Sequence, residues 1–495
     1  MNNKDKRFGI NHIGYVLLVL SALILLCFQC LINGKNLFLA VPTWSDELDY
    51  FREIFSFSEN GFNFGGSLFA GYDAKLGPMG AHSFSPILVW GLFSLFSWNE
   101  HSILIFNLAF LTVSWIVFIA LVRPKGKSLI CILVLAYLFM PLYLYLPTSM
   151  IEVPLYAAII IYFALFNKYM ESDKKAIWFW LTILMGAYIT GIRITYVVVL
   201  FPVILAKTDY KLNKRTIRNL AIYVVLFLIF YKIYNLFCAD YPDWTTSKLS
   251  SADGVVGKLK VILWNVKDNI HKYFSIHNGS AAEVVLRYVY GIAIAIIGFS
   301  SLFEMPGKIK FKFNARLFSY FIMSGGLLTM MIFLYDIRDY RDFRTFSPIL
   351  FFMVMLFGLH KTNDGLHKWL KRGLSTAVVC MMAVIFSVNL MDDRVVEKNT
   401  EAVEGFEVLD TEDEEGRPLI LATTFDINWK DVGLMKSVPS KLGFQVFYKD
   451  LVEENNKKVA YILTTDIFVS DHPDIFENYD YICNIEAYGP LYKVR

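Results

Sequence analysis

Long runs of apolar residues, separated by short basic segments, constrain this chain more than any other feature. A helix that crosses the apolar core of a bilayer needs ~20 mostly apolar residues. We read eleven spans, near residues 13–32, 102–122, 128–147, 149–166, 176–191, 194–206, 219–238, 284–303, 316–335, 345–360 and 374–391. Only 18% of the residues are charged, against about 25% in soluble proteins. The sequence therefore predicts a mainly α, polytopic membrane helix bundle and argues against a water-soluble enzyme.

Basic residues between the apolar runs set the expected orientation, because loops rich in Lys and Arg stay on the cytoplasmic side. Six segments carry 22 basic residues: the N-terminus and 123–127, 167–175, 207–218, 304–316 and 360–372. All six fall on one side if the short apolar stretch 84–97 does not cross, and we interpret it as a re-entrant or juxtamembrane helix. The expected exoplasmic parts are then the loop 33–101, the turn at 148, the loop 239–283, the segment 336–344 and the C-terminal tail.

The C-terminal 104 residues differ in composition from the rest of the chain. Residues 392–495 hold 11 Lys and Arg against 22 Asp and Glu, although the whole chain has a net charge of +3. Short β-rich runs such as KVAYILTTD alternate there with polar connectors, a pattern typical of a small α/β unit. We predict a membrane domain over 1–391 and a soluble, exoplasmic α/β domain over 392–495, which begins with a charged helix or linker.

The cysteines and the first apolar run exclude two other classes of protein. Six scattered cysteines without a CxxC spacing indicate neither a disulfide framework nor a thiolate metal site. The run 13–32 is long enough to span and has no clear cleavage site, so we expect an anchor rather than a removed signal peptide. No motif such as HExxH is present, so no cofactor is certain, and a divalent metal on scattered carboxylates stays an open alternative.

Four polar clusters lie at or near the expected exoplasmic face, where ionisable groups beside membrane segments tend to mark function. The first contains Trp44, Asp46 and Glu47. Thr43, three residues before Asp46, resembles a capping box and predicts a helix start. The apolar residues that follow recur on one helical face, so we expect a short amphipathic helix on the membrane. Asp46 and Glu47 are candidate catalytic carboxylates, or they complement the dipole of that helix.

The second and third clusters each carry a candidate functional side chain. The loop KLGPMGAHSFSP contains Lys75 and His82, although a lone histidine is more often a structural hydrogen-bonding group. The segment PTSMIEVP places Glu152 at the start of a helix at the lipid boundary. A buried glutamate there needs a partner, while a dipole role at the N-terminus of the helix explains it almost as well.

The fourth cluster is rich in arginine. Arg338, Arg341 and Arg344 recur every three residues around Tyr340, and their forked donors suit a phosphate group. The interleaved aspartates of the same segment could instead neutralise them in a solvated ion-pair network. Arg193, and likewise the arginine at 287, lies close to a predicted helix end, where snorkelling toward water is the default account.

The order of these parts resembles the GT-C glycosyltransferases, in particular the protein O-mannosyltransferase and lipid A aminoarabinose transferase branch. Trp44-Ser45-Asp46-Glu47 is similar to the family's acidic motif after the first membrane helix. His82 to Leu88 loosely matches the end of its exoplasmic loop, and Glu152 matches its second acidic residue. Residues 186–193 look like its G-x-x-x-T-[+] stretch, and 338–348 like its late Arg/Tyr-rich element.

The resemblance implies a membrane glycosyltransferase that moves a sugar from a polyprenyl-phosphate donor to a glycan, lipid or protein acceptor, with inversion. Asp46 would be the base, assisted by Glu47 or Glu152. The donor phosphate would bind Arg193 and the Arg338–Arg344 segment, and the substrate would contact Trp44, Lys75 and His82. Such an enzyme would act at the outer face of a bacterial cytoplasmic membrane, among its lipids and without nucleic acid. The alternatives are an O-antigen polymerase or ligase and a polysaccharide or lipid transporter.

Overall fold

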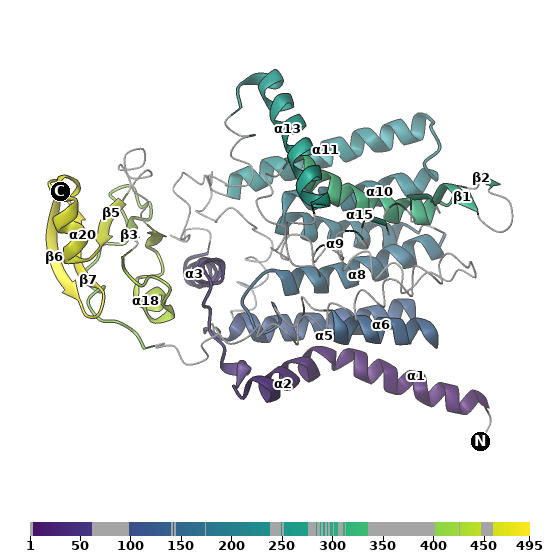
Figure 1. Cartoon of the computed structure of the whole chain (residues 1–495), viewed down its shortest axis with the longest axis horizontal. Coiled ribbons are helices and arrows are strands. Elements are labelled where there is room, and N and C mark those ends of the chain that lie inside the picture. Colours follow the sequence, from purple (N-terminus) through teal and green to yellow (C-terminus); the bar gives the residue numbers. More distant parts are fainter. Residues whose placement is uncertain are drawn as a thin grey trace.

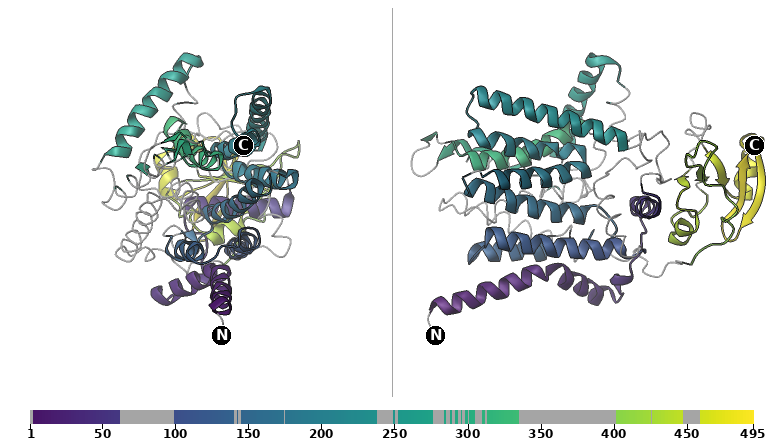
Figure 2. Two further views of the ribbon diagram at one scale, coloured as in Figure 1. Left: turned by 90° about the vertical axis from the view of Figure 1, so that its right-hand side faces the viewer. Right: turned by 180° about the vertical axis from the view of Figure 1, so that it is seen from behind.

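The computed structural model of the chain consists of a helical bundle and a small sheet domain beyond one end of it (Figure 1). It describes residues 3–61, 99–139, 145–173, 175–237, 252–275, 310–334 apart from 312, 401–424, 426–446 and 459–495, with scattered positions at 142, 249 and 284–304. Figure 2 shows from two further sides that most bundle helices run along one direction. The N-terminus lies at the end of the bundle away from the sheet.

The bundle contains eight long helices in its described part. These are α1 (Asn3–Val19), α2 (Ser21–Asn33), α5 (Ser102–Val122), α6 (Lys127–Leu138), α8 (Glu152–Glu171), α9 (Ala176–Ile192), α11 (Lys214–Phe237) and α15 (Ala315–Leu334). The shorter elements are η1 (Leu37–Leu39), η3 (Ile194–Val199), α10 (Leu200–Leu205), η4 (Ala206–Thr208) and a two-stranded ribbon of β1 (Phe303–Glu304) and β2 (Lys310–Phe311).

The expected eleven spans are not supported. Four helices within the described residues are long and apolar enough to cross a membrane, or five if the α1–α2 pair, bent by 63°, counts as one. The expected span 128–147 becomes the shorter helix α6 followed by a turn, and 194–206 breaks into η3, α10 and η4. The run 194–206 contains Pro202, which cannot donate a backbone hydrogen bond within a helix. The expected spans 345–360 and 374–391, and much of 284–303, lie outside the described residues.

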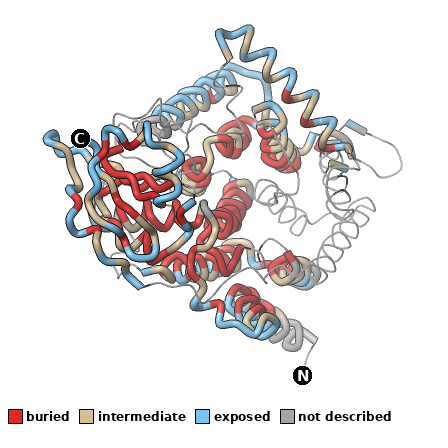
Figure 3. Tube along the Cα trace, turned by 60° about the vertical axis from the view of Figure 1, so that its left-hand side comes forward, coloured by how far each residue is buried: buried red, intermediate tan, exposed pale blue. Residues whose placement is uncertain are grey.

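Burial separates an inner helix from an outer one. In the most apolar stretch of α8, 89% of the residues are buried, against 6% in α11. Figure 3 shows the buried residues gathered on the inner helices and in the sheet domain. Close packing requires small residues at some contacts, since a Cβ added to Gly186 of α9 would lie 2.5 Å from Cδ2 of Leu200. An outer helix that is apolar all round suits a lipid solvent rather than water.

The basic loops gather at one end of the bundle, as the sequence predicted for them. Arg316, at the start of α15, lies 3.8 Å from Glu171 at the end of α8. The Tyr320 hydroxyl donates to Oδ1 of Asn167 at 2.7 Å, and the Tyr15 hydroxyl donates to the carbonyl of Pro124 at 2.9 Å. The hydroxyl oxygens of Tyr210 and Ser319 also lie 2.7 Å apart, which places 207–218 beside the start of α15. The described parts of 167–175, 207–218 and 304–316 therefore share one end, away from the sheet domain, and 123–127 follows α5 at the same end (Figure 1).

The C-terminal domain is an α/β unit, as predicted. Its five-stranded sheet has the order β4-β3-β5-β7-β6, in which β3, β4 and β5 are parallel while β7 is antiparallel to β5 and β6. The elements are β3 (Ile420–Thr423), α18 (Val432–Ser437), β4 (Gly443–Val446), β5 (Val459–Leu463), α20 (Asp466–Asp471), α21 (Pro473–Phe476), β6 (Tyr479–Ile485) and β7 (Gly489–Val494). Residues 401–417 form turns and extended backbone, so the linker alternative holds there rather than a charged helix.

One expected loop is a helix. Residues 254–274 of the expected loop 239–283 form α13 (Gly254–Phe274), which lies across the bundle axis in Figures 1 and 2. It carries five lysine and histidine residues. Its apolar residues are nevertheless spaced for a helix, and that spacing was the overlooked signal.

Candidate functional site

The first polar cluster begins α3 (Ser45–Asn60), a helix placed between the bundle and the C-terminal domain (Figure 1). Oε2 of Glu47 accepts hydrogen bonds from the backbone N–H groups of Thr43 and Trp44, both at 2.9 Å. Glu47 thus satisfies donors that precede the helix, which is the glutamate half of a capping box. The predicted pairing of Thr43 with Asp46 is wrong by one residue, because the helix is capped at Trp44.

Glu47 also joins the first cluster to the third. Its Oε1 accepts the backbone N–H of Ser149 at 2.7 Å, in the turn that precedes α8. The amide of Asn107 on α5 donates to the carbonyl of Thr148 at 3.3 Å and fixes the same turn. With only 2% of its surface exposed and both oxygens accepting backbone donors, the Glu47 carboxylate holds two distant segments together.

Glu152 and Arg193 form an ion pair beside this turn. Nη2 of Arg193 lies 3.8 Å from Oε1 of Glu152, whose residue is 1% exposed. Glu152 lies in the first turn of α8, and Arg193 directly follows α9, so antiparallel neighbours bring the two side chains to one end of the bundle. Arg193 is therefore paired with a buried carboxylate, and snorkelling toward water is not the whole account of its position.

Aromatic rings pack beside the carboxylates. The rings of Trp44 and Tyr145 meet edge to face, with centroids 6.2 Å apart. Both belong to segments that Glu47 holds together. Asp46, next to Glu47 in the first turn of α3, keeps part of its surface exposed, whereas Glu47 is buried. Neighbouring residues point roughly 100° apart on a helix, so the two carboxylates have different surroundings.

The expectation that α3 lies on the membrane is wrong for its apolar face. Leu48 and Phe51, 0% and 1% exposed, belong to the hydrophobic core of the C-terminal domain. Tyr50 and Ile54, on the adjacent face of the helix, belong to the core of the bundle. Burying a Leu or Phe side chain contributes roughly 1.5–3 kcal/mol. The helix therefore packs between two protein cores rather than on lipid.

Arg52 fixes α3 to the C-terminal domain. Its guanidinium donates four hydrogen bonds, to the carbonyls of Met435 (3.0 Å), Val438 (2.8 Å), Pro439 (2.5 Å) and Leu442 (2.7 Å). Burial lowers the pKa of Arg52 to about 9, an effect that nearby Glu59 opposes, so the group stays protonated at neutral pH. A buried cation here neutralises the carbonyl dipoles at the end of α18.

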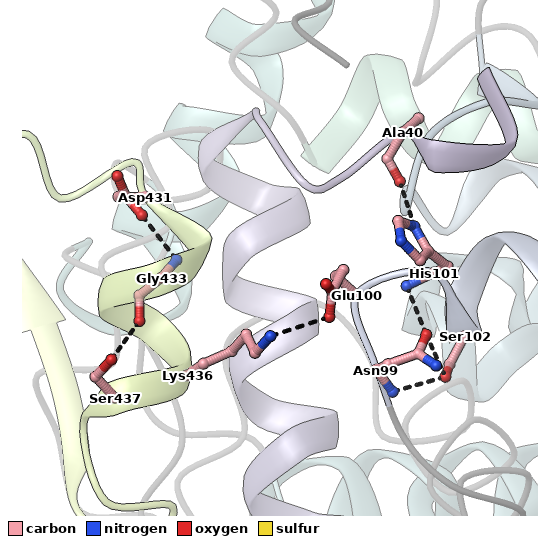
Figure 4. Close-up of polar contacts among 9 residues, drawn as sticks. All are labelled: Ala40, Asn99, Glu100, His101, Ser102, Asp431, Gly433, Lys436 and Ser437. Atoms are coloured by element: carbon pink, nitrogen blue, oxygen red, sulfur yellow. Dashed lines mark hydrogen bonds and ion pairs between the residues drawn. The ribbon is translucent and has the colours of Figure 1, made fainter. Parts of the chain in front are cut away.

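A second polar contact joins the same two parts. Figure 4 shows Lys436 of α18 pointing toward Glu100, with Nζ and Oε2 3.3 Å apart. Burial alone would raise the pKa of Glu100, but a backbone hydrogen bond and the charge of Lys436 outweigh it and lower that pKa. Nearby, Nδ1 of His101 lies 3.2 Å from the carbonyl oxygen of Ala40. The end of the bundle is thus tied to α18 as well as to α3.

The structure brings some of the predicted site residues together and does not describe others. Trp44, Asp46, Glu47, Glu152 and Arg193 share the end of the bundle that faces the C-terminal domain. The remaining candidates lie outside the described residues: Lys75, His82, Arg338, Tyr340, Arg341, Arg344 and the arginine at 287. Within the described residues, no group of three or more His, Cys, Asp and Glu could hold a metal ion.

Sequence reasoning missed Arg52 and the backbone of Ser149. Arg52 follows Phe51 in a helix whose apolar face was assigned to lipid, where an arginine would be read as facing water. The available signal was the position of Arg52 directly beside the expected apolar face, because a charged residue at that place can indicate a contact with protein rather than lipid. Ser149 acts through its N–H group, for which the side-chain sequence carries no signal.

Comparison with known proteins finds little. No protein-family model and no curated protein matches the chain. One similar solved structure is the archaeal oligosaccharyltransferase AglB from Archaeoglobus fulgidus with an inhibitory peptide and a dolichol-phosphate, at 10% identity and a TM-score of 0.47, covering 97% of this chain and 73% of that one. Another is an Archaeoglobus fulgidus oligosaccharyltransferase with zinc and sulfate, at 12% identity and 0.45, with the same coverage. At these values the likeness assigns neither a family nor an activity.

Proposed function

We propose that this protein is a membrane glycosyltransferase that transfers a sugar from a polyprenyl-phosphate donor to a glycan, lipid or protein acceptor. The observation that supports it is the gathering of Trp44, Glu47, Glu152 and Arg193 at one end of an apolar helix bundle. A lipid-linked donor needs a site at the membrane boundary, with a base for the acceptor and cations for the departing phosphate. We assign this end to the outer face of a bacterial cytoplasmic membrane.

Asp46 is the proposed base. It takes the acceptor proton while the acceptor oxygen bonds to the anomeric carbon, and the bond from that carbon to the phosphate oxygen breaks. Glu47 is the proposed positioning residue, because its two oxygens already accept the N–H groups of Thr43, Trp44 and Ser149. Both oxygens of the Glu47 carboxylate are thus occupied by backbone donors and the side chain is buried, so we assign proton transfer to its partly exposed neighbour Asp46.

The proposed cations come from two parts of the chain. Arg193, paired with Glu152, keeps 16% of its side chain exposed and could contact a phosphate from one side. The arginines of the segment 338–344 are proposed as the main phosphate ligands from their sequence spacing. Phosphate is a good leaving group, so charge stabilisation matters more than a general acid.

The decisive experiment measures sugar transfer by purified protein in detergent with a panel of polyprenyl-phosphate and polyprenyl-diphosphate sugars. We expect turnover with a monophosphate donor and its loss, by roughly 10²–10⁴-fold, in Asp46→Asn, because the amide keeps the size but accepts no proton. Glu59→Gln is the matched control, since Glu59 is an exposed carboxylate further along the same helix. Wild-type rates in Asp46→Asn would remove Asp46 as base, and turnover only with diphosphate donors would favour the polymerase or ligase alternative.

A further inference from the structure

Helix α13 is attached across one end of the bundle. The side-chain amide of Asn265 donates to the carbonyl of Phe333 at 3.2 Å, and that of Asn269 donates to the carbonyl of Ile332 at 2.8 Å. Both carbonyls belong to the last turn of α15, one of the helices long and apolar enough to cross a membrane. The polar face of α13 therefore points into the protein, at the end of the bundle where α3 also lies (Figure 1).

The apolar face of α13 points away from the protein. At 100° per residue, five large apolar side chains fall within an arc of about 60°. They are Val256, Leu259, Leu263, Ile270 and Phe274, which are between 42% and 68% exposed. Exposing this apolar stripe to water costs a free energy of roughly 25 cal/mol for each Å² of apolar surface, so an apolar partner is needed.

A basic stripe runs beside the apolar one. Lys260, Lys267 and His271 are exposed and fall within the next arc of about 40°, followed by Trp264, which is 44% exposed. Apolar and basic stripes side by side, with a tryptophan at the edge, are the composition of helices that lie in the membrane interface. A second copy of this chain would have to supply a matching acidic and apolar surface.

We propose that α13 lies in the headgroup layer of the bilayer and binds anionic phospholipid. Its apolar stripe contacts acyl chains, and Lys260 and Lys267 contact lipid phosphates. The attachment of α13 to the last turn of α15 supports a position in the headgroup layer, because the end of a spanning helix marks the membrane boundary. With 21 residues, α13 would cover about 32 Å along the membrane surface.

Photocrosslinking in nanodiscs tests the contact directly. The full-length protein carries a benzophenone amino acid at position 263, in a bilayer of neutral phosphatidylcholine and anionic phosphatidylglycerol. We expect lipid adducts from position 263 and none from position 467, where Ile467 is 72% exposed on the C-terminal domain. Crosslinks from position 263 to a second copy or another protein, or no adduct at all, would overturn the proposal.

A charge variant tests the lipid preference. Lys260→Gln with Lys267→Gln, combined with the probe at 263, should lower the share of phosphatidylglycerol among the adducts by roughly fivefold or more, since each lysine near an anionic surface favours it several-fold. Lys258→Gln is the matched control, because Lys258 is an exposed lysine of the same helix that lies on the side opposite Lys260 and Lys267. An unchanged share in the double variant would rule out recognition of anionic lipid by these lysines.

Discussion

Replacing Arg52 by methionine tests how the C-terminal domain is held to the bundle. In the wild type, one guanidinium satisfies four carbonyls, those of Met435, Val438, Pro439 and Leu442. Methionine keeps an apolar stem of similar length but donates no hydrogen bond. The variant therefore removes the polar contact while it leaves most of the surrounding packing in place.

The expected loss follows from the balance of two terms. Hydrogen bonds to a charged group contribute roughly 1.5–3 kcal/mol each, so four give a gross gain of about 6–12 kcal/mol. Desolvation of a buried ion costs several kcal/mol in return, as the lowered pKa of Arg52 also indicates. We expect Arg52→Met to weaken the docking of the C-terminal domain on α3 by about 3 kcal/mol net.

Hydrogen–deuterium exchange measures this docking in the full-length protein. Peptides from α3 and α18 should exchange roughly 100-fold faster in Arg52→Met, because exchange follows the opening equilibrium and ~1.4 kcal/mol is tenfold. Lys436→Met is the matched control, since its pair with Glu100 is partly exposed and worth at most about 1 kcal/mol. Arg52→Lys should lie between these variants, because one ammonium lacks the planar fork. Unchanged exchange in Arg52→Met would refute the assignment of docking energy to this residue.

Three further predictions concern the candidate site and its orientation. Glu47→Gln should destabilise the protein by about 1–3 kcal/mol, measured by thermal unfolding, because a side-chain amide group would face one of the N–H donors, such as that of Ser149. Reporters fused at Lys211 and after Arg495 should lie on opposite sides of the membrane, the first cytoplasmic; the same side for both would contradict the single-site proposal. Single Arg→Lys changes in the segment 338–344 should weaken binding of a non-transferable polyprenyl-phosphate analogue roughly tenfold for at least one arginine, while equal affinities would favour the ion-pair network.

The sequence by itself determined which segments form bundle helices and which segment forms the α/β unit. Apolar runs of suitable length predicted bundle helices such as α5, α8 and α15, because the need to satisfy backbone groups away from water is local to each run. The distribution of lysine and arginine predicted that the described basic loops would share one end. Successive membrane helices run in opposite directions, so alternate loops lie on the same side, and loops rich in Lys and Arg stay on one side of the membrane. The acidic tail with short β-rich runs predicted the C-terminal α/β unit. Each of these features depends on residues close together in the chain.

Tertiary structure decided which partner each side chain meets. The apolar face of α3 was assigned to lipid, yet Leu48 and Phe51 pack in the C-terminal domain more than 350 residues further along the chain. Helix α13 shows the reverse case, because a run assigned to a loop holds its asparagines against the bundle and exposes its apolar stripe. Hydrophobic periodicity indicates that one face of a helix is removed from water. It does not indicate whether lipid or protein covers that face, because lipid and a protein core are equally apolar. Only the arrangement of the whole chain distinguishes the two.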